Sequence, residues 1–417
     1  MGSPAFPPTF FIIGTDRNIG KTVTSMGIIS KLLSPALGFH PEDIGYIKPV
    51  GQQTSRIRDH SGRMIEVDKD IMLFTELYKL DCADYRAMSP VVWEGGASER
   101  FIDAASTGRL AEEREALCSQ IRDAYVRVAA GRKVVVSEGT GQPGVGSVAG
   151  LSNGDVITLL KDMGVPVITI LVVRGGIGST IDRLFPHLLS LNCMDCHVDG
   201  LIINAVRRDK LDKVGEYLNR YYADAFPRLY GCFPQVKPAP AILGLIPEVP
   251  ELSFPSMRLL TETFFDEQID LIKFTTLSRS VASPDLLVRG IKVRSLEFGF
   301  EAYVEDGDVV IVGINANEAI LSLLAENAKR HAQGHQGLTG LILSCSHASG
   351  LKIDTISEIL ASGVQTMVLP NDSADIIQRI AGLSVKIQPY DLAKRAYVDD
   401  TYRNHLDLSW IADRLHV

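Results

Sequence analysis

The chain has 417 residues, and a length of about 150 residues per domain predicts two or three domains. Hydrophobic residues make up 46% and charged residues 22% of the sequence, which excludes a disordered, collagen-like or low-complexity chain. The formal net charge of −8 includes no basic surplus, so we expect neither a nucleic-acid partner nor an anionic membrane partner.

The sequence shows no pattern of export or membrane insertion. Its longest apolar run, residues 165–173, is less than half of the roughly 20 residues that a spanning helix needs. No charged-apolar-small signal segment opens the chain, so we expect a cytoplasmic protein. Six cysteines are too sparse in this length for a disulfide framework, and we expect reduced thiols.

From residue 9 to residue 248, short β-branched runs alternate with amphipathic stretches of helix length. This alternation predicts an α/β fold with repeated β-α units around a mostly parallel sheet. Helical spacing recurs at 20–33 and at 155–163, the second after the good N-cap types Ser152 and Asn153. The near-continuous hydrophobicity of the strands indicates burial on both faces, and the predicted strands are 9–14, 44–49, 133–138, 165–173, 199–204 and 242–247.

The pattern changes after the first set of strands. Residues 251–283 lose clean alternation, which predicts a connecting helix and linker with a boundary near Pro284. Further buried runs at 308–313, 340–344 and 364–370 predict a second, smaller α/β domain. We therefore expect a first domain at 1–250, a linker at 251–283 and a second domain at 284–417.

The strongest motif, GTDRNIGKT at 14–22, lies between the first strand and the first helix. It has one residue more than G-x-x-x-x-G-K-T but keeps the Gly-Lys-Thr end, which predicts a P-loop that binds ATP phosphates through main-chain N–H groups. Lys21 would add charge near the β- and γ-phosphates, and Thr22 would supply a hydroxyl to Mg²⁺. The alternative is a Gly-rich turn with a solvated lysine. The expected ATP-binding residues of the motif and the start of the helix are Gly14, Thr15, Asp16, Asn18, Ile19, Gly20, Lys21, Thr22 and Val23.

Mg²⁺ prefers oxygen ligands, so carboxylates should lie opposite Thr22. Glu138 ends a predicted strand at the carboxyl edge of the sheet, which is the usual ligand crevice of open α/β folds. Asp70 is a second candidate, and its alternative is an acidic residue that only stabilises the start of a helix. Lys48, at the end of another strand, is placed to meet a transferred phosphoryl group or an anionic substrate, and its alternative is a solvated strand-end lysine.

Together these residues resemble the dethiobiotin synthetase family of P-loop ATPases, in order and spacing, over roughly residues 9–250. Residues 138–140, 144–147, 151–153 and 175–178 are more similar to the nucleotide-binding module at the amino end of long bacterial phosphotransacetylases. Residues 284–395 resemble the DRTGG domain that follows that module, with Gly313-Ile314-Asn315-Ala316-Asn317 in place of its naming motif. The segments that carry the first resemblance are the P-loop, Lys48-Pro49-Val50, Glu138-Gly139, Asn204 and Leu245-Ile246-Pro247.

The resemblance implies roles for individual residues. Lys21 and Thr22 would bind ATP phosphates and Mg²⁺, Asp70 and Glu138 would complete the metal site, and Lys48 would face the substrate. Asn204 and Pro247 would contact adenine, and the protein would be a homodimer. The sequence departs from the family's pattern in the loop, after Lys-Pro-Val and after Glu-Gly, so nucleotide binding is expected but the family's diaminononanoate substrate is not; these departures are Arg17, Asn18, Gln52 and Gln142. The acetyl-transfer module of phosphotransacetylases is not expected in this chain.

Two functions follow. In the first, an enzyme with ATP and Mg²⁺ as cofactors, using Lys21 and Lys48, phosphorylates a carboxylate or carbamate, and an amine then attacks the acyl phosphate. In the second, ATP binding is coupled to the second domain of a regulatory or sensor protein without ligase activity.

Two other motifs predict less. The pattern of haem attachment occurs at Cys193-Met194-Asp195-Cys196-His197, but attachment requires an exported chain and no export signal is seen. The alternatives are a chance match, a redox pair or a weak zinc signal. Gly175-Gly176-Ile177-Gly178 is typical of a tight turn.

Overall fold

The computed structural model describes residues 6–80, 84–93, 95–231, 240–264, 285–294, 299, 303–346 and 350–415. The chain divides into two compact units, Met1–Val249 with Gln388–Val417, and Pro250–Ile387. The predicted boundary at Pro284 lies outside the described residues.

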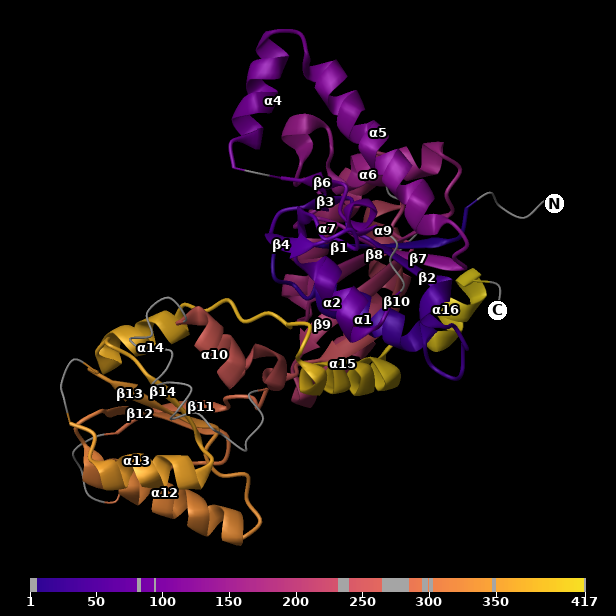
Figure 1. Ribbon diagram of the computed structural model, residues 1–417. Helices are drawn as coiled ribbons and strands as arrows, with labels where there is room; N and C mark the ends of the chain where they lie inside the picture. The colour runs from indigo at the N-terminus through magenta and orange to yellow at the C-terminus, as the bar shows by residue number, and fades with distance from the viewer. Residues whose placement is uncertain are drawn as a thin grey trace. The chain divides into compact units, whose positions relative to one another are not determined.

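The first unit is built on a six-stranded sheet with the order β10-β9-β8-β1-β7-β2 and parallel pairing throughout (Figure 1). Every residue of β1, β2 and β7 is buried, which explains their unbroken hydrophobic character. The predicted α/β class with a mostly parallel sheet is thus confirmed, and the strand positions agree within a few residues. The strands are β1 (Thr9–Gly14), β2 (Ile44–Ile47), β7 (Val134–Glu138), β8 (Val167–Arg174), β9 (Gly200–Val206) and β10 (Ala241–Pro247).

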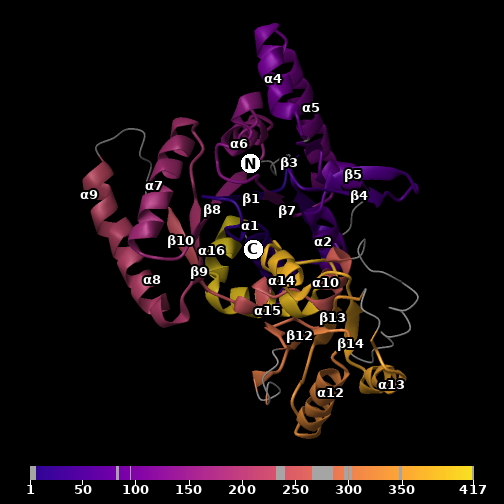
Figure 2. The same ribbon diagram turned by 90° about the vertical axis from the view of Figure 1, so that its left-hand side faces the viewer.

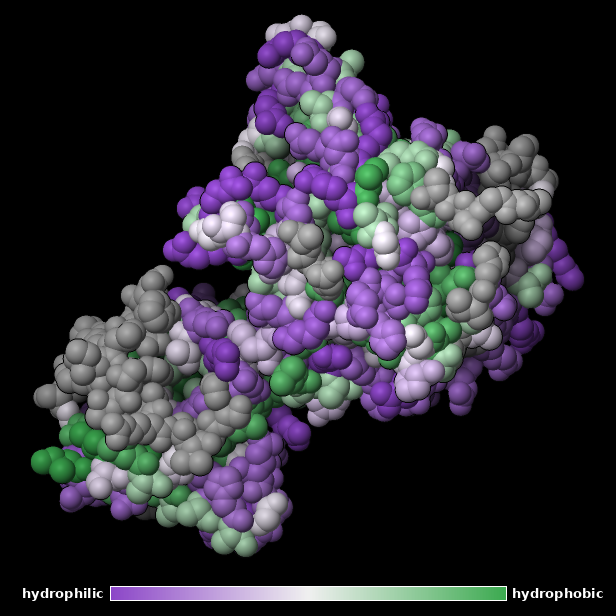
Figure 3. Space-filling model, turned by 45° about the vertical axis from the view of Figure 1, so that its right-hand side comes forward, coloured by the Kyte–Doolittle hydropathy of each residue, from purple (hydrophilic) through white to green (hydrophobic). Residues whose placement is uncertain are grey.

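Helices connect these strands. The Ser152 side chain accepts a hydrogen bond from the Asp155 amide and begins α6 with a capping box, as its position in the sequence predicts. The longest of the described helices, α5, follows α4, and Figure 3 shows mostly hydrophilic side chains over this pair. The helices are α1 (Lys21–Leu32), α2 (Asp70–Leu77), α3 (Tyr85–Met88), α4 (Ala97–Ser106), α5 (Leu110–Ala129), α6 (Asn153–Asp162), α7 (Gly178–Cys193), α8 (Leu211–Arg220) and α9 (Phe226–Tyr230).

Short strands between β2 and α4 are absent from the sequence prediction. β4 (Thr54–Arg58) and β5 (Met64–Asp68) form an antiparallel pair, and β3 (Val50–Gly51) pairs with β6 (Val91–Val92). β4 alternates between exposed and half-buried residues, so it lacks the continuous hydrophobic run by which the other strands are recognised. The start of β4 at Thr54 pairs with the end of β5 at Asp68, and Asp68 contacts Lys48.

The second unit has its own parallel sheet, with the order β11-β12-β13-β14. One hydrophobic cluster joins the sheet to α12 and α13, and another joins it to α10 and α14. Part of the predicted linker, residues 251–283, therefore belongs to this unit, because α10 buries Met257 and Leu260 in its core. The elements are α10 (Met257–Thr263), β11 (Gly290–Val293), β12 (Asp308–Gly313), α12 (Asn317–Ala332), β13 (Gly340–Ser344), α13 (Ile353–Ser362), β14 (Gln365–Val368) and α14 (Ser373–Ala381).

The last described helices, α15 (Leu392–His405) and α16 (Leu408–Leu415), belong to the first unit. The sequence pattern predicts these residues in the second domain, whereas α15 packs along α1 of the first unit (Figure 2). The Tyr402 hydroxyl lies 2.9 Å from the Thr24 hydroxyl oxygen. A Cβ added to Gly27 would lie 2.1 Å from the Tyr402 ring, so the glycine permits this close approach. In the part of the chain that the structure describes, no helix is long and apolar enough to cross a lipid bilayer.

Candidate functional site

The predicted P-loop follows the central strand β1 and leads into α1. Its backbone takes left-handed conformations at Asn18, with φ of 54°, and at Gly20, with φ of 99°. The Asn204 side chain donates a hydrogen bond to the Ile19 carbonyl at 2.9 Å, which fixes the end of the loop from β9. A Cβ at Gly20 would lie 2.1 Å from the Asn204 amide nitrogen, so a glycine is required here on two grounds.

Lys21 is the first residue of α1, and its ammonium group donates to the carbonyl oxygen of Asp16 at 3.3 Å. The lysine therefore lies folded over its own loop. The Thr15 hydroxyl is buried and has no hydrogen-bond partner among the described residues. A buried hydroxyl without a partner is costly unless a ligand satisfies it, so this loop is suited to binding a polar group.

Glu138, at the end of β7, gathers hydroxyl groups from two other elements. Its carboxylate accepts hydrogen bonds from Thr22 at 2.9 Å and Ser25 at 3.0 Å, both on α1. It also accepts one from the Tyr46 hydroxyl on β2 at 3.2 Å. Since Glu138 is 1% exposed, these donors replace the water that a carboxylate would otherwise bind. Glu138 and Thr22 are site residues that the sequence predicts, whereas Ser25 and Tyr46 are not.

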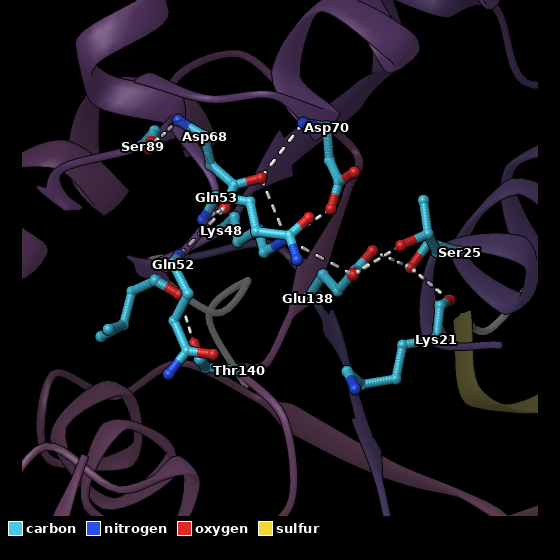
Figure 4. A network of polar contacts seen from close by, with 12 residues as sticks. Lys21, Ser25, Lys48, Gln52, Gln53, Asp68, Asp70, Ser89, Glu138 and Thr140 are labelled. Atoms are coloured by element: carbon cyan, nitrogen blue, oxygen red, sulfur yellow. Dashed lines mark hydrogen bonds and ion pairs between the residues drawn. The ribbon is translucent and has the colours of Figure 1, made fainter. Parts of the chain in front are cut away.

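Lys48 lies among carboxylates from three segments of the chain. Figure 4 shows its ammonium group between Asp68, Asp70 and Glu138. The nitrogen lies 3.0 Å from Asp68 and 3.8 Å from Glu138, and it donates a hydrogen bond to Asp70. The Lys48 side chain is 12% exposed, so the predicted alternative of a solvated strand-end lysine does not describe it.

Charge sets the protonation of this cluster. Burial alone would lower the pKa of Lys48, but Asp70, Glu138 and Asp68 outweigh burial and raise it above its ordinary value, so the lysine stays charged. Burial raises the pKa of Glu138, and Lys48 opposes that shift in part. Burial and the Glu138 charge also raise the pKa of Tyr46, which keeps its hydroxyl a donor.

Asp68 is the member of the cluster that the sequence analysis does not identify. It ends β5, is fully buried, and accepts hydrogen bonds from the amides of Gln52 at 3.2 Å and Asp70 at 3.1 Å. The second of these bonds places Asp68 over the start of α2. Its signal in the sequence is the pair of acids two residues apart, but without the β4–β5 strands no pattern indicates that both of them contact Lys48.

The remaining predicted residues lie at the same edge or beside it. Gly14 and Val23 flank the P-loop, at the end of β1 and in the first turn of α1. Asn204 and Pro247 lie on the neighbouring strands β9 and β10, near their carboxyl ends. Their predicted contact with adenine stays a prediction.

The donors at this edge fit a hard cation. The Thr22 hydroxyl and the carboxylates of Glu138 and Asp70 are oxygen ligands of the kind that Mg²⁺ takes. Within the described residues no group of three or more His, Cys, Asp or Glu side chains is spaced to hold a metal by itself. Mg²⁺ bound to nucleotide does not need such a cage, because waters and phosphate oxygens fill most of its positions.

The cysteine motif starts at the last residue of α7 and contributes no residue to the contacts described above. Cys193 is exposed and Cys196 is buried, and both are free thiols. The Cys196 thiol donates to the Gly154 carbonyl at 3.3 Å, and burial raises its pKa, so it packs as a structural residue.

Comparisons with known proteins place the chain in a family. It is similar to a solved structure titled "OtsA apo structure" at 10% identity, covering 98% of this chain and 99% of that chain, with a TM-score of 0.25. An α,α-trehalose 6-phosphate synthase from Burkholderia multivorans matches at 11% identity over 99% of this chain and 93% of that chain, with a TM-score of 0.22. Neither TM-score supports a conclusion about fold or function. The comparison with curated proteins found no match.

One family model matches more than half of the chain. It is the AAA_26 model, described as an AAA domain, and it covers residues 8–256. The matched range contains the P-loop, Lys48, Asp70 and Glu138. The chain therefore belongs to the AAA_26 family, which includes dethiobiotin synthetase-like P-loop ATPases.

Proposed function

We propose that this protein is a Mg²⁺- and ATP-dependent enzyme that phosphorylates a carboxylate or carbamate. The observation that carries the proposal is the convergence at one sheet edge of a P-loop and the buried cluster of Lys48 with Asp68, Asp70 and Glu138. A sheet edge that only bound nucleotide would need no buried lysine among carboxylates, because burying these charges costs free energy.

The P-loop would hold the triphosphate. Its main-chain N–H groups and the amino end of α1 favour anions, and Thr15 supplies a buried hydroxyl. Lys21 would exchange its contact with the Asp16 carbonyl for the β- and γ-phosphates. Thr22, Asp70 and Glu138 would hold Mg²⁺, which when bound would neutralise charge on the phosphates.

Lys48 would neutralise charge on the transferred group and the substrate. A carboxylate or carbamate oxygen of the substrate would form a bond to the γ-phosphorus while the bond from that phosphorus to ADP breaks. An amine would then attack the acyl carbon, lose a proton and expel inorganic phosphate. Catalysis would rest on alignment and charge, because phosphoryl transfer needs little covalent help from side chains.

The direct test is nucleotide binding and turnover. We expect Lys21→Ala to abolish ATP binding measured by calorimetry while the circular dichroism spectrum stays that of the wild type. Lys213→Ala, on the exposed surface of α8, is the matched control and should bind as the wild type does. Unchanged affinity in Lys21→Ala would overturn the site.

Turnover then separates enzyme from binding protein. Phosphate release should rise when candidate carboxylates with amines are added. Tight ATP binding with negligible release under every condition would overturn the enzyme proposal.

That second outcome would favour the regulatory alternative, which one observation supports. The chain leaves the first unit at Val249, forms the second unit, and returns at Gln388 to pack α15 on the P-loop helix α1. A conformational change at the P-loop would thus be transmitted through α1 to α15, which directly follows the second unit in the chain. The DRTGG-like character of that unit stays a prediction.

A further inference from the structure

Of the carboxylates that contact Lys48, Asp68 stands outside the proposed metal-ligand set. Its side chain is 1% exposed, against 12% for Lys48, and the two are 3.0 Å apart. A buried carboxylate at this distance is a strong partner for an ammonium group, because little water screens the pair.

The main chain fixes the position of Asp68 on several sides. Its carboxylate accepts hydrogen bonds from the amides of Gln52 at 3.2 Å, Gln53 at 3.4 Å and Asp70 at 3.1 Å. Its own amide donates to the Ser89 hydroxyl at 2.9 Å. The position of Asp68 therefore does not depend on Lys48 or on any bound ligand.

Asp70 and Glu138 are in a different situation. Both contact Lys48, and both belong to the metal-ligand set proposed above. A divalent cation on these carboxylates would compete with the ammonium group for their oxygens and would repel it. Lys48 is too buried to lose every partner without a large cost.

We propose that Asp68 is the positioning residue that holds Lys48 in the site when a divalent cation takes over Asp70 and Glu138. This inference rests on the proposed function and deepens it. Asp68 keeps the ammonium group at the sheet edge, where it can face the substrate, and the hydrogen bond from the Asp70 amide keeps α2 in place. Metal binding would thereby remove the contacts of Lys48 with Asp70 and Glu138, while the contact with Asp68 keeps the lysine in the site.

A double-mutant cycle on metal affinity tests this role. Mg²⁺ is titrated by calorimetry into the full chain in the presence of a non-hydrolysable ATP analogue. We expect Asp68→Asn to weaken Mg²⁺ binding by about 10- to 100-fold, the usual effect of losing a partner that orients the groups around a metal. In the Lys48→Met background the same change should have little further effect, since no lysine is left to hold. An equal loss in both backgrounds would overturn the proposal, because Asp68 would then act directly on the metal or on the fold.

A second pair of measurements covers the event that Lys48→Met does not fold. Asp68→Asn should leave affinity for the metal-free analogue unchanged, because Asp70 and Glu138 still hold Lys48 there. Lys213→Ala, on the exposed surface of α8, is the control and should leave Mg²⁺ affinity as in the wild type. A loss of metal-free affinity in Asp68→Asn would mark Asp68 as a structural residue only.

Failure of the proposed function would be seen in the wild type. A wild-type chain that does not bind the analogue even with Mg²⁺ would overturn the nucleotide site itself. If the wild-type chain binds the analogue and Mg²⁺, and the losses of Mg²⁺ affinity in the two single mutants add up in the double mutant, only the role of Asp68 would be overturned.

Discussion

The two units present parallel sheet edges of different chemistry. At the carboxyl edge of the first sheet, Lys48 and Glu138 belong to a buried cluster of charges. At the corresponding edge of the second sheet, the Ser344 and Ser373 hydroxyl oxygens lie 3.1 Å apart, and Asn317 accepts a hydrogen bond from Thr355 at 2.7 Å. Similar strand arrangements therefore create similar edges, and the side chains that follow the strands decide the chemistry there.

Charges of the second unit gather instead near the amino end of β12. Asp306 accepts hydrogen bonds from the amides of Gln336 and Gly337, and it pairs with Arg330 and His335, each at 3.2 Å. These contacts fasten neighbouring loops to one another. Charged side chains thus join loops in the second unit, whereas in the first unit they are concentrated at the carboxyl edge of the sheet.

The largest expected difference between the two edges concerns buried charge. Lys48→Met leaves carboxylates buried without their cation and should lower the free energy of unfolding of the first unit by about 3–5 kcal/mol. Ser344→Ala removes a neutral hydrogen bond and should cost about 1 kcal/mol in the second unit. Urea unfolding, followed by probes in each unit, measures both. Equal losses would remove the contrast between the edges.

The next effect is on metal dependence. Glu138→Gln removes the charge that faces Thr22 and should weaken Mg²⁺ binding by at least about tenfold, or about 1.4 kcal/mol. Ser373→Ala, at the other edge, should leave the Mg²⁺ titration unchanged. An unaltered titration in Glu138→Gln would count against its role as a ligand.

A packing mutation in the first unit should lower the stability of that unit alone. Gly27→Ala forces a methyl group against the Tyr402 ring and should destabilise the first unit by about 1–3 kcal/mol. Unfolding of the second unit should be unaffected, which hydrogen exchange of each unit can measure. A matching loss of protection in the second unit would show that the units do not unfold independently.

The smallest effect concerns acid stability. Burial would raise the pKa of Asp306, but hydrogen bonds from Gly337, Gln336 and Arg330 outweigh it and lower the pKa below its ordinary value. The stability gained from Asp306 is therefore present at pH values above its unfolded pKa and is lost as pH falls through the lower folded value. Asp306→Asn should remove this acid sensitivity at a cost of about 1 kcal/mol or less at neutral pH. A mutant with the same acid unfolding curve as the wild type would contradict the assignment.

Most of the fold could be predicted because its strands are buried on both faces. Fully buried strands such as β1 and β7 give unbroken apolar runs that single out their positions. β4 is half exposed and gives no such run, so the sequence does not predict the strand pair that carries Asp68. Neither the unit to which α15 belongs nor the helix on which it packs could be predicted, because its contact with α1 joins residues that are far apart in the sequence.

The candidate site divides in the same way. Residues attached to a motif or to a strand end, such as Lys21, Lys48 and Glu138, could be named from the sequence because strand order and chain direction bring them to one edge. Ser25 and Tyr46 could not, because a serine inside a helix and a tyrosine inside a strand look like ordinary packing residues. Their role depends on a side-chain direction that no local pattern records.

The packing of Tyr402 against Gly27 has a consequence for biosynthesis. A growing polypeptide emerges from the ribosome amino end first, so the P-loop helix is made long before the residues that cover it. The second unit is continuous in the chain and can fold as soon as it emerges, while the first unit waits with one face of α1 exposed. During that interval the nascent protein is open to chaperones and to misassembly, and the unit that carries the P-loop is completed last although it begins first.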